Sequence, residues 1–99
     1  MTNPEPPQVD RILRFSLTSA DAQRLSGFYE QAFGFRCVAA RRDCGADFEH
    51  MMAVSGGATT LTLTLGHEQI ELVEYDRPGR AYPEHATSAD LIFQHFALV

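Results

Sequence analysis

One carboxylate stands where a charged side chain is costly to bury. Glu71 lies in the run 69–75, whose residues alternate between two faces in the manner of a β-strand. The alternation puts Ile70 and Leu72 on one face, and Glu71 with Tyr75 on the other. A carboxylate between hydrophobic neighbours needs a partner of opposite charge or a metal ion. Glu71 is therefore the first candidate for chemistry.

The histidines and cysteines before residue 90 give weaker signals. His67 falls in an expected turn and His85 in an expected connector, where histidine is more often exposed than a ligand. Cys37 and Cys44 do not have the Cys-x-x-Cys spacing, and this favours two free thiols in a reducing compartment.

The elements that must position Glu71 follow from hydropathy patterning. The stretch 59–65 alternates leucine with threonine, which is typical of a half-buried strand, and Gly66 begins a turn into the strand that carries Glu71. Upstream, apolar residues at helical spacing lie between the capping residue Asp21 and Gly34. The pattern predicts, in order, a strand over 12–18, a helix over 22–33, a strand over 35–41, and a hairpin of strands over 59–65 and 69–75.

The segment 43–58 has a mixed pattern. Phe48, Met51 and Met52 have the spacing of one helical turn, while glycines interrupt the pattern around them. We predict a short helix within a long loop. It would form a wall of a ligand pocket, because methionine adapts to varied shapes, or it would plug the core or meet a partner chain.

Composition predicts one domain of ordinary globular type. The 99 residues are 44% hydrophobic, and no apolar run reaches the roughly 20 residues that span a bilayer. The net charge of -5, without a cluster of basic residues, argues against nucleic acid as a partner. The start lacks the basic and apolar regions of a secretory signal, so we expect a cytoplasmic protein.

The domain organisation is expected to follow the same patterns. Residues 1–10 hold three of the five prolines and predict a flexible arm. The strands and helix above form a unit over 11–76, and 77–90 reads as a polar linker. The run 91–99 is again strand-like, and His95-Phe-Ala-Leu repeats the pattern of Arg14-Phe-Ser-Leu. We expect it to open a second unit that is incomplete in this chain.

Three stretches together resemble the vicinal oxygen chelate superfamily, which includes glyoxalase I, bleomycin resistance proteins and extradiol dioxygenases. They are the helix with its ends, 21–35, the strand Ile70-Glu71-Leu72, and the closing His95-Phe-Ala-Leu-Val. The resemblance covers residues 11–99. It implies an α+β fold: a single βαβββ module with a mixed sheet, followed by the first strand of a second module. In the superfamily, paired modules form a cup around a divalent metal.

The resemblance also implies roles for individual residues. Glu71 falls on a metal-ligand position and is the candidate catalytic residue, and His95 falls on a second metal-ligand position, with Zn, Ni, Fe or Mn as the ion. Arg14 falls where glyoxalase-like members often have histidine, and arginine cannot donate to a metal. The competing arrangement is an Arg14–Glu71 ion pair, which would tether an anionic ligand or neutralise a buried charge. Ser16 and Tyr75 share the face of Glu71 and are candidate ligand-binding residues.

Three functions remain open from the sequence. The first is a divalent-metal enzyme, a glyoxalase-like lyase or a dioxygenase, that acts on a small oxygenated substrate. The second is a metal-free protein that binds a small molecule, as resistance or sequestering relatives do. The third is a chain without a complete site. A lone module would leave a sheet edge and a cup face exposed, so we expect a homodimer, with modules face to face or with the strand 91–99 exchanged.

Overall fold

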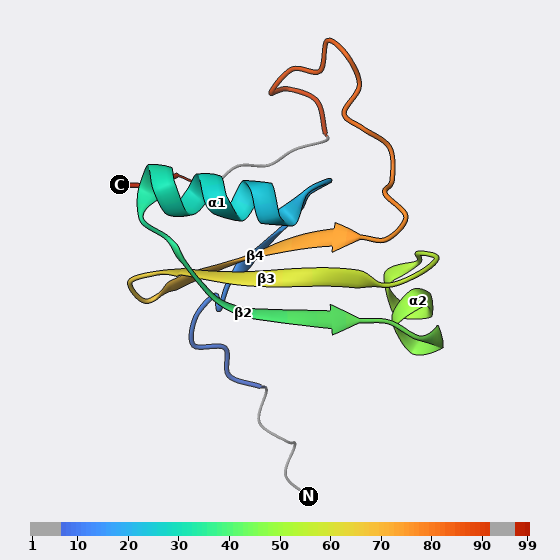
Figure 1. Cartoon of the computed structure of the whole chain (residues 1–99), viewed down its shortest axis with the longest axis horizontal. Coiled ribbons are helices and arrows are strands. Elements are labelled where there is room, and N and C mark those ends of the chain that lie inside the picture. The colour runs from blue at the N-terminus through green and yellow to red at the C-terminus, as the bar shows by residue number, and fades with distance from the viewer. Residues whose placement is uncertain (1–6, 92–96) are drawn as a thin grey trace, which may run out of the picture.

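The computed structural model describes residues 7–91 and 97–99, and within them four strands and two helices form one layered unit (Figure 1). The elements are β1 (Phe15–Thr18), α1 (Ala22–Phe33), β2 (Arg36–Asp43), α2 (Ala46–Met52), β3 (Ala58–Leu65) and β4 (Glu68–Tyr75). The strands lie in the order β1-β4-β3-β2, and β1 is parallel to β4 while the other neighbours are antiparallel. The predicted α+β module with a mixed sheet is confirmed. His95 and most of the predicted strand 91–99 fall outside the described residues.

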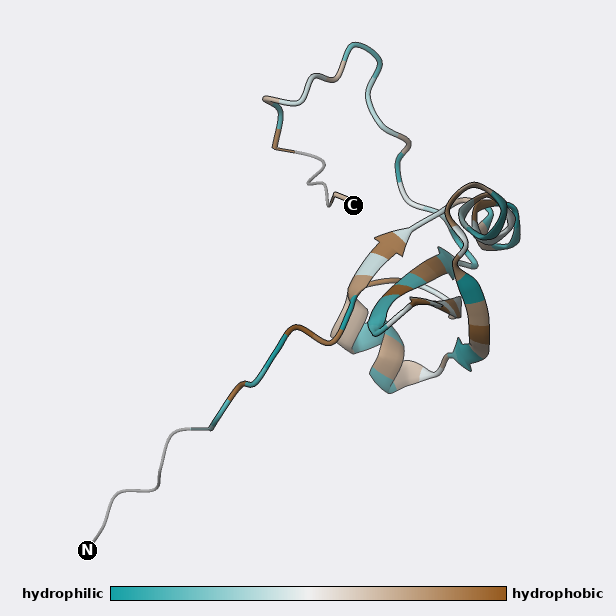
Figure 2. Ribbon diagram, turned by 90° about the vertical axis from the view of Figure 1, so that its left-hand side faces the viewer, coloured by the Kyte–Doolittle hydropathy of each residue, from teal (hydrophilic) through white to brown (hydrophobic). Residues whose placement is uncertain are grey.

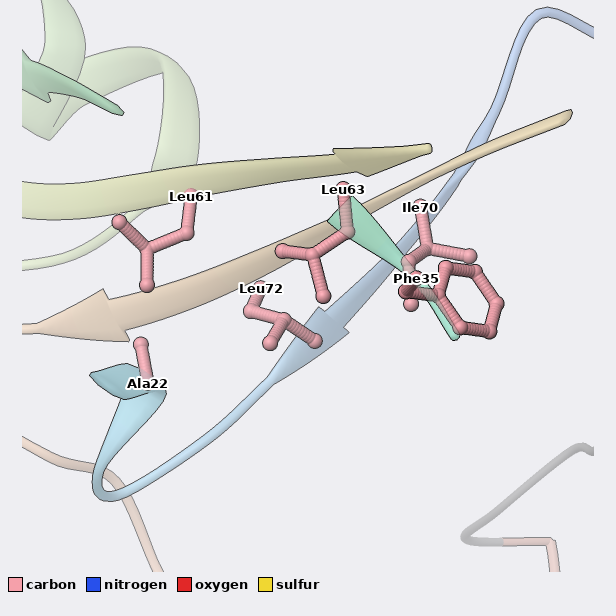
Figure 3. Close-up of a cluster of buried hydrophobic side chains, with 6 residues drawn as sticks. All are labelled: Ala22, Phe35, Leu61, Leu63, Ile70 and Leu72. Carbon is pink, nitrogen blue, oxygen red and sulfur yellow. The ribbon is translucent and has the colours of Figure 1, made fainter. Parts of the chain in front are cut away.

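The core lies between α1 and one face of the sheet. Leucines of β3 pair in register with apolar residues of β4, Leu61 with Leu72 and Leu63 with Ile70. Along several strands in Figure 2, brown residues are separated by white or teal ones, in keeping with the period of two. The buried cluster consists of Ala22, Phe35, Leu61, Leu63, Ile70 and Leu72 (Figure 3). Each buried Leu, Ile or Phe of the cluster contributes about 1.5–3 kcal/mol by leaving water, so this cluster fixes which face of the sheet stays open.

Polar contacts set both ends of α1. The Asp21 side chain accepts a hydrogen bond from the backbone N–H of Arg24, and Gly34 ends the helix at φ 78°. From the sheet, Glu74 accepts a hydrogen bond from the backbone N–H of Ala22 at 2.8 Å. A carboxylate at a helix N-terminus also complements the helix dipole. Glu74 thus anchors α1 over β4.

The largest differences from the expected boundaries are in the first two strands, and the other strand ends differ by one residue at most. The first strand begins at Phe15 and not at Ile12, because β1 is an edge strand whose pairing with β4 starts at Phe15. The second strand runs to Asp43 and not to Arg41, because β3 continues to pair with it up to that residue. The predicted short helix within the loop after this strand is confirmed as α2. None of the helices in residues 7–91 or 97–99 is long and apolar enough to cross a membrane.

Candidate functional site

Glu71 lies in the middle of β4 and faces away from α1. Its neighbours Ile70 and Leu72 belong to the core cluster, so the alternation of the strand turns Glu71 to the opposite, open face. Its register partners are Ser16 on β1 and Thr62 on β3. Only 4% of Glu71 is exposed. The expectation of a carboxylate buried in the middle of this strand is confirmed.

Two arginines and a hydroxyl hold the Glu71 carboxylate. Arg41 NH1 donates a hydrogen bond to Oε1 at 2.8 Å, and Arg14 Nε forms an ion pair with the same oxygen at 3.0 Å. Ser16 Oγ donates to Oε2 at 3.0 Å. The Arg14–Glu71 ion pair that the sequence left as an alternative is therefore present in the structure. Burial without partners would strongly disfavour the charge, and these three groups compensate for it.

The pKa of Glu71 reflects this competition. Burial is the largest influence and acts to raise the pKa, but hydrogen bonds from Arg41 and Ser16 and the charges of Arg41 and Arg14 together lower it below its usual value. The pKa of Arg41 is raised, first by its hydrogen bond to Glu71 and then by its hydrogen bond to Asp43. The site is therefore a neutralised cluster of ionised groups at neutral pH.

Arg41 is the member of this cluster that sequence reasoning missed. It lies on β2, two strands away from Glu71, with Thr60 of β3 as its register partner. Its Nε donates to Asp43 Oδ2 at 3.0 Å, and this holds the guanidinium over the sheet. Alternation within the strand gave no signal for Arg41, because a bulge between Cys37 and Ala39 shifts the face of every later residue of β2.

A cavity of about 440 Å³ opens above Glu71, and we call it the Glu71 cavity. Its polar floor includes Ser16, Arg41 and Glu71, and the side chains of α2 form an apolar wall. Phe48 of α2 stacks on Tyr75, with ring centroids 6.5 Å apart. The residues that line the cavity are Ser16, Thr18, Arg41, Asp43, Phe48, Met51, Met52, Ala58, Thr60, Glu71, Val73 and Tyr75. The structure thus brings Ser16 and Tyr75 to the same cavity as Glu71.

Among the residues that the structure describes, those around Glu71 do not fit a divalent metal ion. Both guanidinium groups already contact Oε1, and their positive charges would repel a cation at that oxygen. Ser16 occupies the other carboxylate oxygen. Within the part of the chain that the structure describes, no three or more His, Cys, Asp or Glu side chains gather as a metal site would require. His95, the second expected ligand, lies outside that part.

Comparison with known proteins gives a match over most of the chain. A family model described as "Glyoxalase/Bleomycin resistance protein/Dioxygenase superfamily" matches residues 11–99. A search of curated proteins gave no match.

Proposed function

Since the chain belongs to the glyoxalase/bleomycin resistance protein/dioxygenase superfamily, we propose that it is a metal-free member that binds a small oxygen-bearing organic molecule in the Glu71 cavity. The observation that carries this proposal is the Glu71 carboxylate held by Arg14 and Arg41 at the floor of the cavity. Because the Glu71 carboxylate contacts both guanidinium groups, it can orient their remaining N–H donors.

The lining of the cavity defines the class of ligand. The guanidinium of Arg41 only donates hydrogen bonds, so it favours a ligand that presents acceptor oxygens, as a carboxylate or a carbonyl does. The Arg41 side chain is 48% exposed and can turn a donor toward the cavity without leaving Glu71. Phe48, Met51 and Met52 offer an apolar surface that adapts to the ligand body. The volume of about 440 Å³ is within the usual range for small-molecule sites.

The divalent-metal enzyme is the function that this arrangement disfavours. An ion held by Glu71 and His95 would require the Glu71 carboxylate to give up its contacts with Arg14 and Arg41. Elemental analysis of protein prepared without chelators tests this directly. One Zn, Ni, Fe or Mn ion per chain that disappears in Glu71→Gln would overturn the metal-free proposal. No stoichiometric ion in either protein is the expected result.

A second copy of the chain completes the proposed site. The open face of the sheet carries the cavity and leaves large apolar side chains of α2 in solvent, with Met51 74% exposed. Covering that face with the same face of another copy would bury these side chains and enclose the ligand. The proposed functional unit is therefore a homodimer.

Ligand-observed NMR tests the binding proposal. The probes are benzoate and cyclohexanecarboxylate. Each is compared with the alcohol of the same carbon skeleton, benzyl alcohol or cyclohexylmethanol. We expect the carboxylates to bind and to bind about tenfold more weakly to Arg41→Gln, because a hydrogen bond to a charged group is lost. Arg24→Gln on α1 removes the same charge away from the cavity and should leave binding unchanged. Equal affinity in the two variants, or preference for the alcohols, would refute the proposal.

A further inference from the structure

The apolar wall of the Glu71 cavity is carried by a loop whose two ends nearly touch. We call residues 44–57, which include α2, the α2 loop. At its end, Gly57 is buried against the end of β2: a Cβ atom there would lie 2.5 Å from the carbonyl oxygen of Asp43 and 2.9 Å from Cβ of Cys44. A side chain cannot fit in that space, so glycine allows the close approach that closes the loop.

Asp76 fastens this closure from the end of β4. Its Oδ2 accepts a hydrogen bond from the backbone N–H of Gly57 at 3.0 Å, and its own backbone N–H donates to the carbonyl of Gly57 at 2.9 Å. Arg42 of β2 donates from NH1 to Oδ1 of Asp76 at 2.6 Å and from NH2 to Oδ2. The Asp76 carboxylate therefore connects the end of the α2 loop to β2 and to the end of β4.

Further contacts restrain the residues next to Gly57 and connect them to α2. Gly56, next to Gly57, donates its backbone N–H to Oε1 of Glu49 on α2. Arg77, next to Asp76, donates to Ser55 Oγ at 2.8 Å. Both contacts belong to the three residues that precede β3, so the loop is held at consecutive positions. The helix that bears Phe48 is thereby tied to the end of β4.

We propose that Asp76 is a positioning residue for the Glu71 cavity: by holding Gly57 and Arg42 it sets the placement of the α2 wall against the polar floor. The inference rests on the proposed function for its consequence on binding, but the contacts themselves are independent of any ligand. Tyr75, adjacent to Asp76, lines the cavity and stacks on Phe48, so a shift of the loop changes the cavity directly.

The Arg42–Asp76 ion pair is exposed, so we expect its loss to affect the α2 loop and not the stability of the whole fold. The side chains of Arg42 and Asp76 are 49% and 39% exposed, and exposed ion pairs add little to global stability. The hydrogen bond to Gly57, in contrast, acts at the point where the α2 loop closes. Loss of Asp76 should therefore open the α2 loop without unfolding the sheet.

Amide hydrogen exchange of Asp76→Asn tests this inference. We expect the amides of Gly57 and Val54 to exchange about tenfold faster than in the wild type, while the amides of Leu63 and Leu72 keep their rates. The nuclear Overhauser effect between the Phe48 and Tyr75 rings should weaken in the same variant. Glu68→Gln, an equal charge change at the exposed first residue of β4, is the matched control and should leave all of these unchanged.

The outcomes separate the two proposals. Unchanged exchange at Gly57 and Val54 in Asp76→Asn would overturn the positioning role, as would an equal rise at Leu63 and Leu72. If the loop opens and benzoate also binds Asp76→Asn more weakly, both proposals are supported. If the loop opens and the wild type binds no carboxylate probe, the proposed function falls while the role of Asp76 in placing α2 stands.

Discussion

Glu71 shows how one buried charge is made tolerable by its neighbours. Removing its carboxylate from water is unfavourable, and the structure answers with Arg14, Arg41 and Ser16. Both arginine side chains remain partly in solvent, so screening reduces what each contact contributes. The cluster therefore contributes only moderately to the free energy of unfolding, and that contribution needs all of its members.

We expect Glu71→Gln to lower the free energy of unfolding by about 1–2 kcal/mol, because it leaves two neighbouring guanidinium groups without their shared anion. Urea denaturation at neutral pH measures this loss. Glu68→Gln, at the exposed first residue of β4, should change stability by less than about 0.5 kcal/mol. The same small change in both variants would contradict the account of Glu71.

The lowered pKa of Glu71 gives this difference a defined pH dependence. A carboxyl whose pKa is lower in the folded state stabilises the fold fully above the unfolded-state pKa, about 4.3, and loses that contribution as the pH falls through the lower folded-state pKa. The stabilities of wild type and Glu71→Gln measured by urea denaturation should therefore differ most at neutral pH and converge as the pH falls below about 4.3. Asp76, whose pKa is lowered chiefly by a hydrogen bond from Arg42, is common to both proteins and cancels in the comparison. A difference that is constant with pH would contradict the prediction.

The sequence predicted the site residues that lie on β4 and those at the neighbouring first strand. Alternation within β4 identified Glu71 and Tyr75, and the family's strand order suggested Arg14 and Ser16 beside it. Arg41 required the register of β3 and β2 and the bulge within β2, which no local pattern encodes. Asp76 and Gly57 meet through a loop closure, so neither stands out in the sequence.

At the level of elements, the sequence predicted whether a segment is a helix or a strand better than it predicted where the segment begins and ends. The interior of α1 and its capping residues lie in one local stretch, and the predicted helix 22–33 is confirmed. The start of β1 depends on where β4 offers a partner, and Phe15 is still 50% exposed at that edge. Strand ends therefore need tertiary information that periodicity does not contain.

Two glycine substitutions distinguish a required glycine from a permissive one. Gly57→Ala should lower the free energy of unfolding by about 1–3 kcal/mol, because its Cβ would collide with the backbone oxygen of Asp43. Gly27→Ala, in the interior of α1 with no heavy atom within 4 Å of a new Cβ, should raise it by about 0.5–1 kcal/mol. Thermal or urea denaturation measures both. Equal effects of the two substitutions would contradict the close approach at Gly57.

At the scale of the whole molecule, residues 7–91 and 97–99 contain one module with one covered and one open sheet face. The hydrophobic core occupies the face under α1, while the Glu71 cavity occupies the other. A second module within the chain, the homodimer and the cytoplasmic location stay predictions.

Light scattering tests the homodimer. We expect a mass of twice the 11.0 kDa chain in solution. Met51→Glu, which puts a charge on the face that the dimer would cover, should shift the mass to that of the monomer. Gln31→Glu adds the same charge to an exposed position of α1 and should leave the dimer intact. A monodisperse wild-type monomer would refute the proposal.

The parallel pairing of β1 with β4 has a consequence for folding. The strands β2, β3 and β4 are linked by short or local connections, whereas Ser16 and Glu71 are 55 residues apart. Because distant contacts carry a larger loop-closure cost, we expect β1 to dock after the rate-limiting step. Ser16→Ala, which loses a hydrogen bond to a charged group, should then raise the unfolding rate about fivefold and leave the refolding rate nearly unchanged in stopped-flow kinetics, and slower refolding would contradict this order. The floor of the cavity would then be the last part of the protein to assemble and the first to come apart.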